Sequence, residues 1–340
     1  MRPNTERTDR VLVAASVFST GVIVAAVFVG VRSIAWFDVL HGVPGSVDAD
    51  ILWRIRLPRV CLGFLSGAVL AVGGVALQAV FRNPLATPYT LGISAGAAVG
   101  AALYMKAGLS LTVGGIPGLA IAAWVSAAFA TALMFGLTRA GRGFSTATLL
   151  LTGVALSFFF SSVVLFIQYI GDVTTSFRVG RWLMGGLEVV GFAPVWQLAP
   201  FATIGLATVI AARRDLDLLA MGDESAASRG VVVRRVKVRL LVAVSTMVAG
   251  VVATCGPIGF VGLIVPHVGR LVVGPKHDRL VPLTLLGGGT FLVLCDTAAR
   301  TVIAPVEIPV GVITALLGGP FFLALLLRQR ASAERERGVG

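Results

Sequence analysis

Long apolar runs separated by short polar breaks make up most of the chain. Runs that approach the roughly 20 apolar residues of a bilayer-spanning helix occupy residues 11–36, 60–81, 92–106, 115–137, 147–170, 194–212, 236–255, 258–273, 280–298 and 309–327. The runs 92–106 and 258–273 are short, so we expect helices that are tilted, broken or only partly inserted. The pattern predicts an all-α polytopic membrane protein with about ten transmembrane helices.

Composition agrees with a bilayer as the surrounding solvent. Of 340 residues, 56% are hydrophobic and 13% are charged, whereas about a quarter of the residues in a soluble domain are charged. Gly92, Gly96 and Gly100 recur at the four-residue spacing that lets transmembrane helices approach closely. We therefore interpret the many glycines as packing residues and predict a helix contact along this stripe.

The polar segments are too short to form a separate soluble domain. We treat residues 1–340 as one domain, with a tail over 1–10, a ten-helix bundle over 11–327 that includes a polar loop over 213–239, and a tail over 328–340. The run over 11–36 is too long for a signal-peptide core and lacks a clear cleavage site. We expect it to be retained as the first span.

The distribution of Lys and Arg predicts an orientation in the membrane. An even number of spans places both termini on one side, and cations are enriched on the cytoplasmic side. With both termini in the cytoplasm, all but eight of the 28 Lys and Arg residues fall inside. The eight exceptions, outside or near the outer ends of spans, are Arg32, Arg54, Arg56, Arg59, Lys106, Arg178, Arg181 and Arg300.

The sequence lacks the motifs of several functional classes. The net charge of +12 lies in gaps between apolar runs, which fits membrane topology better than a nucleic-acid-binding face. No G-x-x-x-x-G-K-[ST] loop is present, and we expect no catalytic residues. Cys61, Cys255 and Cys295 lie in apolar stretches at unrelated spacings and indicate buried hydrophobes rather than disulfides or metal ligands. Every Asp and Glu lies in a loop or near a span end, which disfavours an ion-coupled carrier.

The polar loop over 213–239 predicts two short helices that lie flat on the cytoplasmic face. Their expected boundaries are Asp215 or Asp217 and Gly222 for the first helix, and Asp223 and Gly230 for the second. The side chains expected to face outward are Leu218, Leu219 and Met221. Such a surface suits docking into a groove on a soluble partner, or it is an interfacial amphipathic loop without a partner. The pattern alone favours neither.

Other polar positions also leave two interpretations open. The loop over 83–89 carries two prolines, which force an extended turn between two spans, but an ordinary connector would look the same. The fifth span contains Thr152, Ser157, Ser161, Ser162 and Gln168. These groups can line a polar passage, or their hydroxyls can bond to their own helix. His267 follows a proline near the end of a short helix and is expected to form a structural hydrogen bond rather than bind a metal.

Eight segments together resemble the FecCD-type permeases, the membrane subunits of ABC importers for iron-siderophores, haem and vitamin B12. In family order they are Arg56-Leu-Pro-Arg59, Gln78 with Arg82-Asn-Pro-Leu-Ala86, Gly92-Ile-Ser-Ala-Gly96, Trp182-Leu-Met-Gly-Gly186, Gly222-Asp-Glu through Gly230, Gly256-Pro-Ile-Gly-Phe-Val-Gly-Leu-Ile-Val-Pro-His267 with Arg270, Asp296 with Arg300, and Pro309-Val-Gly-Val through Gly319-Pro-Phe-Phe322. One departure is Arg229, which stands where an apolar residue is expected.

The resemblance implies the type II ABC importer permease fold and a homodimer with one passage at its interface. It also implies two ATP-binding-cassette ATPase subunits, a substrate-binding protein on the outer face, and a place in the lipid of the cytoplasmic (inner) membrane. ATP and Mg would belong to the ATPase, so this chain is expected to bind no cofactor. The expected function is import of a large metal chelate, with an iron-siderophore preferred over haem or vitamin B12. The alternatives are an ion-coupled secondary transporter and a non-transporting membrane assembly protein.

The resemblance further implies roles for single residues. Those expected to couple to the ATPase are Leu216, Leu218, Leu219, Met221, Gly222, Asp223, Glu224 and Gly230. The expected inner gate is Asn83, Pro84, Leu85, Ser145 and Thr146. Arg56, Arg59 and Arg300 are expected to face outward and meet acidic residues of the binding protein. The translocation path is expected to include Ser157, Ser161, Gln168 and Trp182, with the fifth and tenth spans facing the second copy and a short outer helix over 176–186.

Overall fold

The computed structural model describes residues 3–30, 47–140 and 146–337, and this part of the chain is almost entirely helical. The elements are α1 (Pro3–Phe28), α3 (Val47–Asp50), the π-helix η1 (Ile51–Arg56), α4 (Leu57–Phe81), the 3₁₀-helix η2 (Pro88–Leu91), α5 (Ile93–Lys106), β1 (Thr112–Val113), β2 (Ile116–Pro117), α6 (Gly118–Ala140), α7 (Thr146–Tyr169), α8 (Val173–Leu183), α9 (Ala193–Ala211), α10 (Arg213–Met221), α11 (Asp223–Ser228), α12 (Val233–Cys255), α13 (Val261–Val273), α14 (His277–Thr301) and α15 (Val310–Arg337). The strands β1 and β2 form a two-stranded antiparallel hairpin.

Each predicted apolar run overlaps one helix for most of its length, so the all-α polytopic fold is confirmed. Among the described residues, seven helices are long and apolar enough to cross a membrane, and Val261–Val273 and Val310–Leu325 are shorter apolar helices. Two predicted tails are partly helical, because α1 begins at Pro3 and α15 continues to Arg337. The last residues of the first predicted run, 31–36, lie outside the described part.

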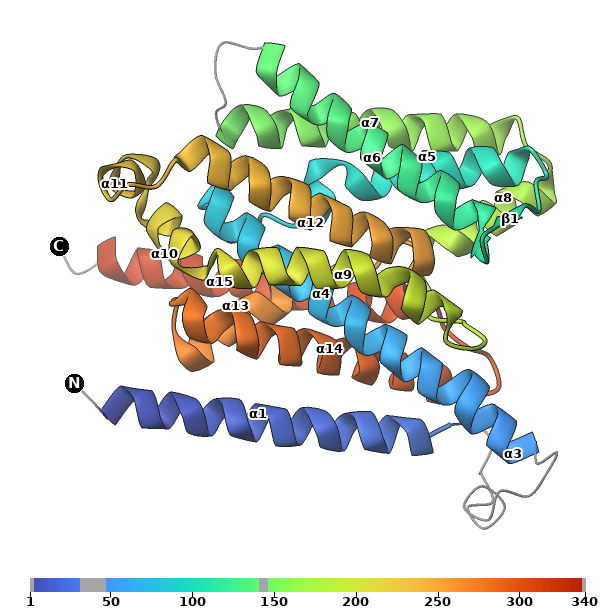
Figure 1. The fold of residues 1–340 in the computed structure, drawn as a ribbon, viewed down its shortest axis with the longest axis horizontal. Coiled ribbons are helices and arrows are strands. Elements are labelled where there is room, and N and C mark those ends of the chain that lie inside the picture. The colour runs from blue at the N-terminus through green and yellow to red at the C-terminus, as the bar shows by residue number, and fades with distance from the viewer. Residues whose placement is uncertain (1–2, 31–46, 141–145, 338–340) are drawn as a thin grey trace.

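The helices run side by side along the long axis of the molecule (Figure 1). The N-terminus, the C-terminus, α10 and α11 lie at one end, which we call the terminus end. The opposite end, which holds α3, β1 and α8, is called the distal end. α4 lies at the centre and contacts α9, α12, α13 and α14. In the segment Val47–Phe81, 83% of the residues in the apolar 18-residue stretch are buried.

Glycines set the closest helix contacts, as the sequence predicts. A Cβ atom at Gly100 would meet the backbone oxygen of Ala122, and one at Gly96 would meet the Cβ of Ala130, so the stripe on α5 packs against α6. A similar contact joins α4 to α13, where Gly74 lies against the backbone of Gly262. Small residues let these backbones approach at distances that larger side chains would prevent.

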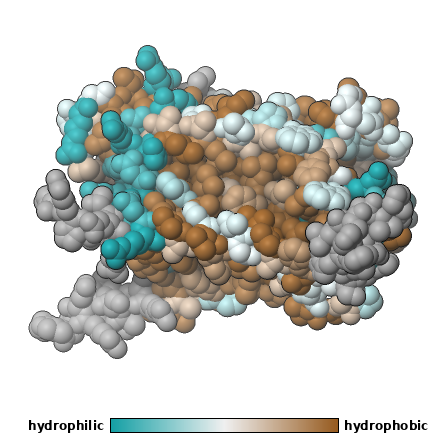
Figure 2. Space-filling model, turned by 60° about the horizontal axis from the view of Figure 1, so that its bottom comes forward, coloured by the Kyte–Doolittle hydropathy of each residue, from teal (hydrophilic) through white to brown (hydrophobic). Residues whose placement is uncertain are grey.

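The molecular surface separates into apolar and polar zones. Figure 2 shows a broad hydrophobic band across the middle of the molecule and hydrophilic residues gathered at the terminus end. Large apolar side chains are exposed on several helices, among them Phe129 on α6, Phe158 and Leu165 on α7, and Leu271 on α13. Exposed apolar surface on this scale is expected where lipid or another membrane subunit covers it.

Candidate functional site

The polar loop forms the two short helices that the sequence predicts, α10 and α11 (Figure 1). Gly222 ends the first and begins the second, with φ 124° and ψ 154°, a conformation that favours glycine. The predicted aspartate caps are wrong, because α10 is preceded by Ala212 and α11 by Gly222, neither of which makes a side-chain cap. The aspartates form ion pairs and hydrogen bonds with neighbouring helices instead.

The expected outward orientation of this loop is correct only in part. Met221 is 58% exposed, but Leu216 and Leu219 are completely buried and Leu218 is half-buried. Leu216 and Leu219 stand three residues apart and therefore share the face that packs on the body of the protein. Leu219 is thus a packing residue that fixes α10 to the bundle, and the surface available to a partner lies around Met221.

Three aspartates attach the two helices to the bundle. Oδ1 of Asp217 accepts a hydrogen bond from the backbone N–H of His277 (2.9 Å) and lies 2.6 Å from its Nδ1, at the start of α14. Asp223 pairs with Lys237 on α12 (2.7 Å), and Asp215 pairs with Arg239 (3.1 Å). Sequence reasoning missed these contacts, since nothing in the spacing of distant charges identifies the pairs.

The segment after α4 forms a hydrogen-bonded turn, in which the backbone N–H of Ala86 donates to the backbone oxygen of Asn83 (3.1 Å), and η2 begins at Pro88. Arg82 adopts a left-handed conformation (φ 48°, ψ 36°) that ends α4. The Asn83 side chain accepts a hydrogen bond from the backbone N–H of Leu85 (2.9 Å), and the Leu85 side chain is 41% exposed. Ser145 lies outside the described residues, and the Thr146 side chain is also not described. The proposed pairing of this turn with residues 145–146 therefore stays a prediction.

A cavity of about 380 Å³ lies beside this turn at the terminus end. Its lining residues are Gln78, Ala79, Arg82, Asn83, Pro84, Leu85, Ala220, Leu263, His267, Arg270, Pro275, His277, Phe321, Phe322 and Leu325. Arg270 donates a short hydrogen bond to Oε1 of Gln78, whose Nε2 donates to the backbone oxygen of Gly262 (3.1 Å). The cavity thus joins the turn after α4, α10, α13 and α15.

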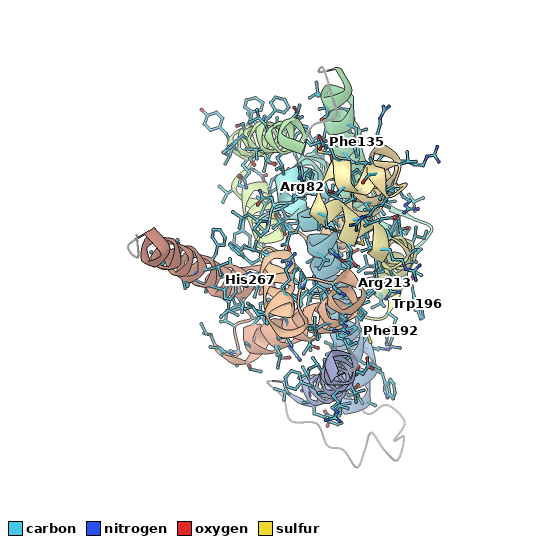
Figure 3. The ribbon with its side chains drawn as sticks, turned by 90° about the vertical axis from the view of Figure 1, so that its left-hand side faces the viewer. Arg82, Phe135, Phe192, Trp196, Arg213 and His267 are labelled. Carbon is cyan, nitrogen blue, oxygen red and sulfur yellow. The ribbon has the colours of Figure 1, made fainter. Side chains whose placement is uncertain are left out.

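Figure 3 shows His267 near the middle of the terminus end. Its ring meets Phe321 edge-on at 5.9 Å between centroids. The prediction of a structural hydrogen bond at His267 is wrong for the described residues, where the ring makes no such bond.

Among the described residues, no group of three or more His, Cys, Asp or Glu side chains could hold a metal ion. All three cysteines are free, with Cys255 and Cys295 buried as predicted and Cys61 half-buried.

The three arginines expected to face outward are buried instead, with exposed fractions of 4% for Arg56, 6% for Arg59 and 5% for Arg300. Arg59 donates to Asp296 from Nε (3.0 Å) and Nη2 (2.9 Å), and its Nη1 donates to Glu307 (2.7 Å). The expected exposure was wrong because these guanidinium groups find carboxylate and carbonyl partners within the chain, so no charge has to reach water.

Arg56 and Arg300 hold the end of the first helix. Arg56 donates to the backbone oxygens of Val27 (3.3 Å) and Phe28 (2.9 Å). Arg300 donates to those of Ala26 (2.9 Å) and Val29 (3.1 Å). The last carbonyls of a helix have no partner within it and carry partial negative charge, so cations stabilise them. The two arginines therefore tie α1 to the end of η1, which leads into α4, and to α14.

The fifth span, α7, presents a mixed surface. The Ser157 hydroxyl donates to the backbone oxygen of Gly153 (2.8 Å), which is the helix-internal alternative considered above. Ser161 is exposed and Gln168 is half-buried. Trp182, on α8, is also half-buried and packs against the core. The structure thus leaves Ser161 and Gln168 accessible, and the translocation role of all four residues stays a prediction.

The short outer helix expected over 176–186 is observed as α8 at the distal end. Asp172 caps its start by accepting the backbone N–H of Thr175 (3.1 Å), and hydrogen bonds from the Thr175 side chain and backbone lower the pKa of Asp172. Arg181 pairs with Glu188 (2.6 Å), and the hydrogen bond that its guanidinium donates to this carboxylate raises the pKa of Arg181. Both partners of this pair are about half exposed.

Comparison with known proteins accounts for this arrangement. The model of the FecCD transport family matches residues 12–328. The chain belongs to the FecCD transport family. It is 41% identical over 294 residues to the hemin transport system permease protein of Yersinia pestis, covering 83% of this chain and 85% of that protein. It is 43% identical over 289 residues to the cobalamin import system permease protein of Halobacterium salinarum, covering 84% of this chain and 75% of the relative.

A third relative and a solved structure support the same family assignment. The Fe(3+) dicitrate transport system permease protein of Escherichia coli is 37% identical over 316 residues, 91% of this chain and 96% of that protein. A solved inward-facing structure, assigned to the metal-chelate type of ABC transporter, superposes with a TM-score of 0.84 at 30% identity, covering 94% of this chain and 99% of that one. As a FecCD family member, the chain is a multi-pass transport permease.

Proposed function

We propose that this chain is the permease subunit of an ATP-driven, binding-protein-dependent importer of a large metal chelate, with an iron chelate as the preferred substrate. Family membership over residues 12–328 supports this proposal. The structural observation that carries it is the α10–α11 pair, which stands at one end of the bundle with Met221 exposed. A rigidly attached, exposed element of this kind suits transmission of force from a soluble ATPase.

The orientation follows from charge. The terminus end carries the cations of the polar loop and of the start of α14, and Figure 2 shows it as the more hydrophilic end. Cations favour the cytoplasmic side, so the proposal places both termini, α10 and α11 in the cytoplasm. The chain then lies in the cytoplasmic membrane, with ATPase subunits at the terminus end and a substrate-binding protein at the distal end.

The proposal includes a homodimer. α7 and α15 lie on the same side of the molecule in the view from the terminus end (Figure 3, left). Both present large exposed apolar side chains, including Phe158 (73%), Leu165 (65%) and Leu316 (66%). A second copy that covers this side would enclose a passage between the two chains, with Ser161 and Gln168 of α7 near it.

Reconstituted vesicles test the function. Permease, ATPase and binding protein are combined, and uptake of radioactive iron chelate is measured with and without ATP. We expect uptake only with ATP and all three components. Met221→Asp should reduce uptake with normal membrane insertion, because a charge replaces the exposed apolar contact. Met221→Leu is the matched control, because it keeps an apolar side chain of similar size at this exposed position. Uptake that persists without the ATPase would overturn the proposal.

A further inference from the structure

The cavity at the terminus end has an unusual charge balance. Arg82, His267, Arg270 and His277 lie in its wall, and none of the described residues that line it is Asp or Glu. The His277 ring is already engaged by Asp217. Three basic side chains from α4 and α13 therefore border a space of about 380 Å³ without a carboxylate in its wall.

Neighbouring cations at the same end are neutralised within the chain. Arg213 lies 3.8 Å from Asp278, and Lys237 and Arg239 have the aspartate partners described above. Arg82 and Arg270 have no carboxylate within ion-pair distance in the part of the chain that the structure describes, and the Arg270 side chain donates a hydrogen bond to the neutral side chain of Gln78. Of these two, Arg270 is half-buried, and a partly buried charge without a counter-charge is unfavourable, so the cavity is suited to an anion.

The backbone at Arg82 gives an independent reason. This residue adopts a left-handed conformation, which costs a non-glycine residue roughly 1 kcal/mol. Glycine would occupy the position without that cost. The arginine side chain instead extends toward the junction of α10 and α11, since its Nη1 would lie 3.5 Å from a Cβ atom at Gly222. Strain of this kind at a charged side chain points to a use for the guanidinium group.

The position of the cavity indicates what could reach it. Phe321, Phe322 and Leu325 of α15 form one wall, and α15 lies on the side where the second copy and the passage are placed by the proposed function. A molecule that leaves the passage at the terminus end would meet this wall before entering the cytoplasm. The Arg82 side chain is exposed there, and Arg270 is half-buried behind it.

We propose that this cavity is an exit site for oxyanions, in which Arg82, Arg270 and His267 bind the carboxylate or catecholate oxygens of an anionic metal chelate. The inference rests on the proposed function and assigns these side chains to the negatively charged groups of the chelate. Guanidinium groups bind planar oxyanions through paired, charge-assisted hydrogen bonds. The volume suits one arm of a large chelate rather than the whole molecule.

Binding to the purified permease–ATPase complex tests the site directly. The probes are the iron(III) complex of a tris-catecholate, which is negatively charged, and that of a trihydroxamate, which is neutral. Equilibrium dialysis with radioactive iron measures both affinities at one ionic strength. We expect Arg270→Gln and Arg82→Gln each to weaken binding of the anionic complex about tenfold or more, because each removes a charge-assisted contact. Binding of the neutral complex should change little.

Controls separate the site from general electrostatic effects. Arg270→Lys should lose less affinity than Arg270→Gln, because it keeps the charge but not the paired hydrogen bonds. Arg279→Gln should match the wild type because Arg279 lies on α14 outside the cavity lining. If Arg270→Gln misfolds, Arg82→Gln still tests the site, because the Arg82 side chain is exposed and its replacement should not disturb folding. Equal binding of the anionic complex by wild type and both Gln variants would overturn the inference. So would tight binding of inorganic phosphate with no preference between the two iron complexes, which would indicate a phosphate site.

The transport assay distinguishes this failure from failure of the proposed function. ATP-dependent uptake of any metal chelate supports the function whatever its charge. Uptake with unchanged binding in the cavity variants contradicts only the exit site. The absence of ATP-dependent uptake for every chelate contradicts the proposed function itself.

Discussion

Arg59 and Asp296 are 237 residues apart in the chain, yet hydrogen bonds of 2.9 Å and 3.0 Å join their side chains at the distal ends of α4 and α14. Arg300 lies 3.3 Å from the same carboxylate. One buried aspartate thus balances two buried arginines. Removing one partner of such a group leaves an uncompensated buried charge, which is far more costly than losing an exposed pair.

Asp296→Ala should therefore destabilise the protein by about 3–5 kcal/mol, because Arg59 and Arg300 lose their shared counter-charge. Thermal unfolding of the detergent-solubilised protein measures the effect. The matched control is Asp50→Ala, which removes the exposed i,i+4 pair with Arg54 (3.3 Å) and should cost at most about 1 kcal/mol. Equal shifts in the unfolding temperature of the two variants would show that burial does not determine how much Asp296 contributes to stability.

The burial of this group marks a limit of sequence reasoning. The family resemblance predicted that Arg56, Arg59 and Arg300 face outward and meet the binding protein, which would also explain their departure from the positive-inside trend. The structure gives another reason for the departure, since these cations are partners of Asp296, Glu307 and the end of α1. Asp296 and Arg300 stand four residues apart in the sequence, a visible sign of an ion pair. The third partner, Arg59, could be found only from the fold.

At the scale of elements, helix positions were predictable and helix contacts mostly were not. Each apolar run became a helix because a bilayer allows few other backbone arrangements. The glycine stripe on α5 was also readable, since close approach requires small residues at fixed spacing. The attachment of α10 was not readable, because it depends on Asp217 and His277, which are separated by 60 residues.

Gly100→Val should destabilise the α5–α6 contact by about 1–3 kcal/mol or more, since the added Cβ would meet the backbone oxygen of Ala122, which cannot move aside easily. Resistance to thermal unfolding in detergent measures this cost. Gly136→Val is the matched control on α6, because a Cβ at Gly136 would have nothing within 4 Å. A comparable loss in both variants would contradict a packing explanation.

The Asp217–His277 contact is the strongest candidate for passing motion from α10 to α14. Asp217→Ala removes the acceptor of the His277 backbone N–H, so we expect iron uptake per ATP hydrolysed to fall about tenfold, the equivalent of one charged hydrogen bond. Uptake and phosphate release are measured together in reconstituted vesicles. Asp215→Ala, on the same helix, removes the more exposed pair with Arg239 and should leave the ratio nearly unchanged. A proportional loss of both activities in Asp217→Ala would instead indicate misfolding.

At the scale of the whole molecule, a single chain exposes apolar surface that lipid or another protein has to cover. Exposed apolar side chains on α6 and α7 look alike by hydropathy, and the sequence does not say which face meets lipid and which meets protein. The arrangement of helices separates them. α7 lies with α15 on the side assigned to a second copy, whereas Phe129 of α6 belongs to the outer apolar surface that we assign to lipid.

Cysteine cross-linking in membranes tests this assignment. Leu165→Cys on α7, at a position 65% exposed, should cross-link two copies through a short bifunctional maleimide, because the dimer places the two α7 helices near each other. Phe129→Cys on α6, at a position 60% exposed, should give no dimer band because lipid separates the copies there. The native Cys255 and Cys295 are buried and Cys61 is half-buried, so the unsubstituted protein serves as the background. A dimer band for Phe129→Cys and none for Leu165→Cys would move the interface from α7 to α6, and the passage with it.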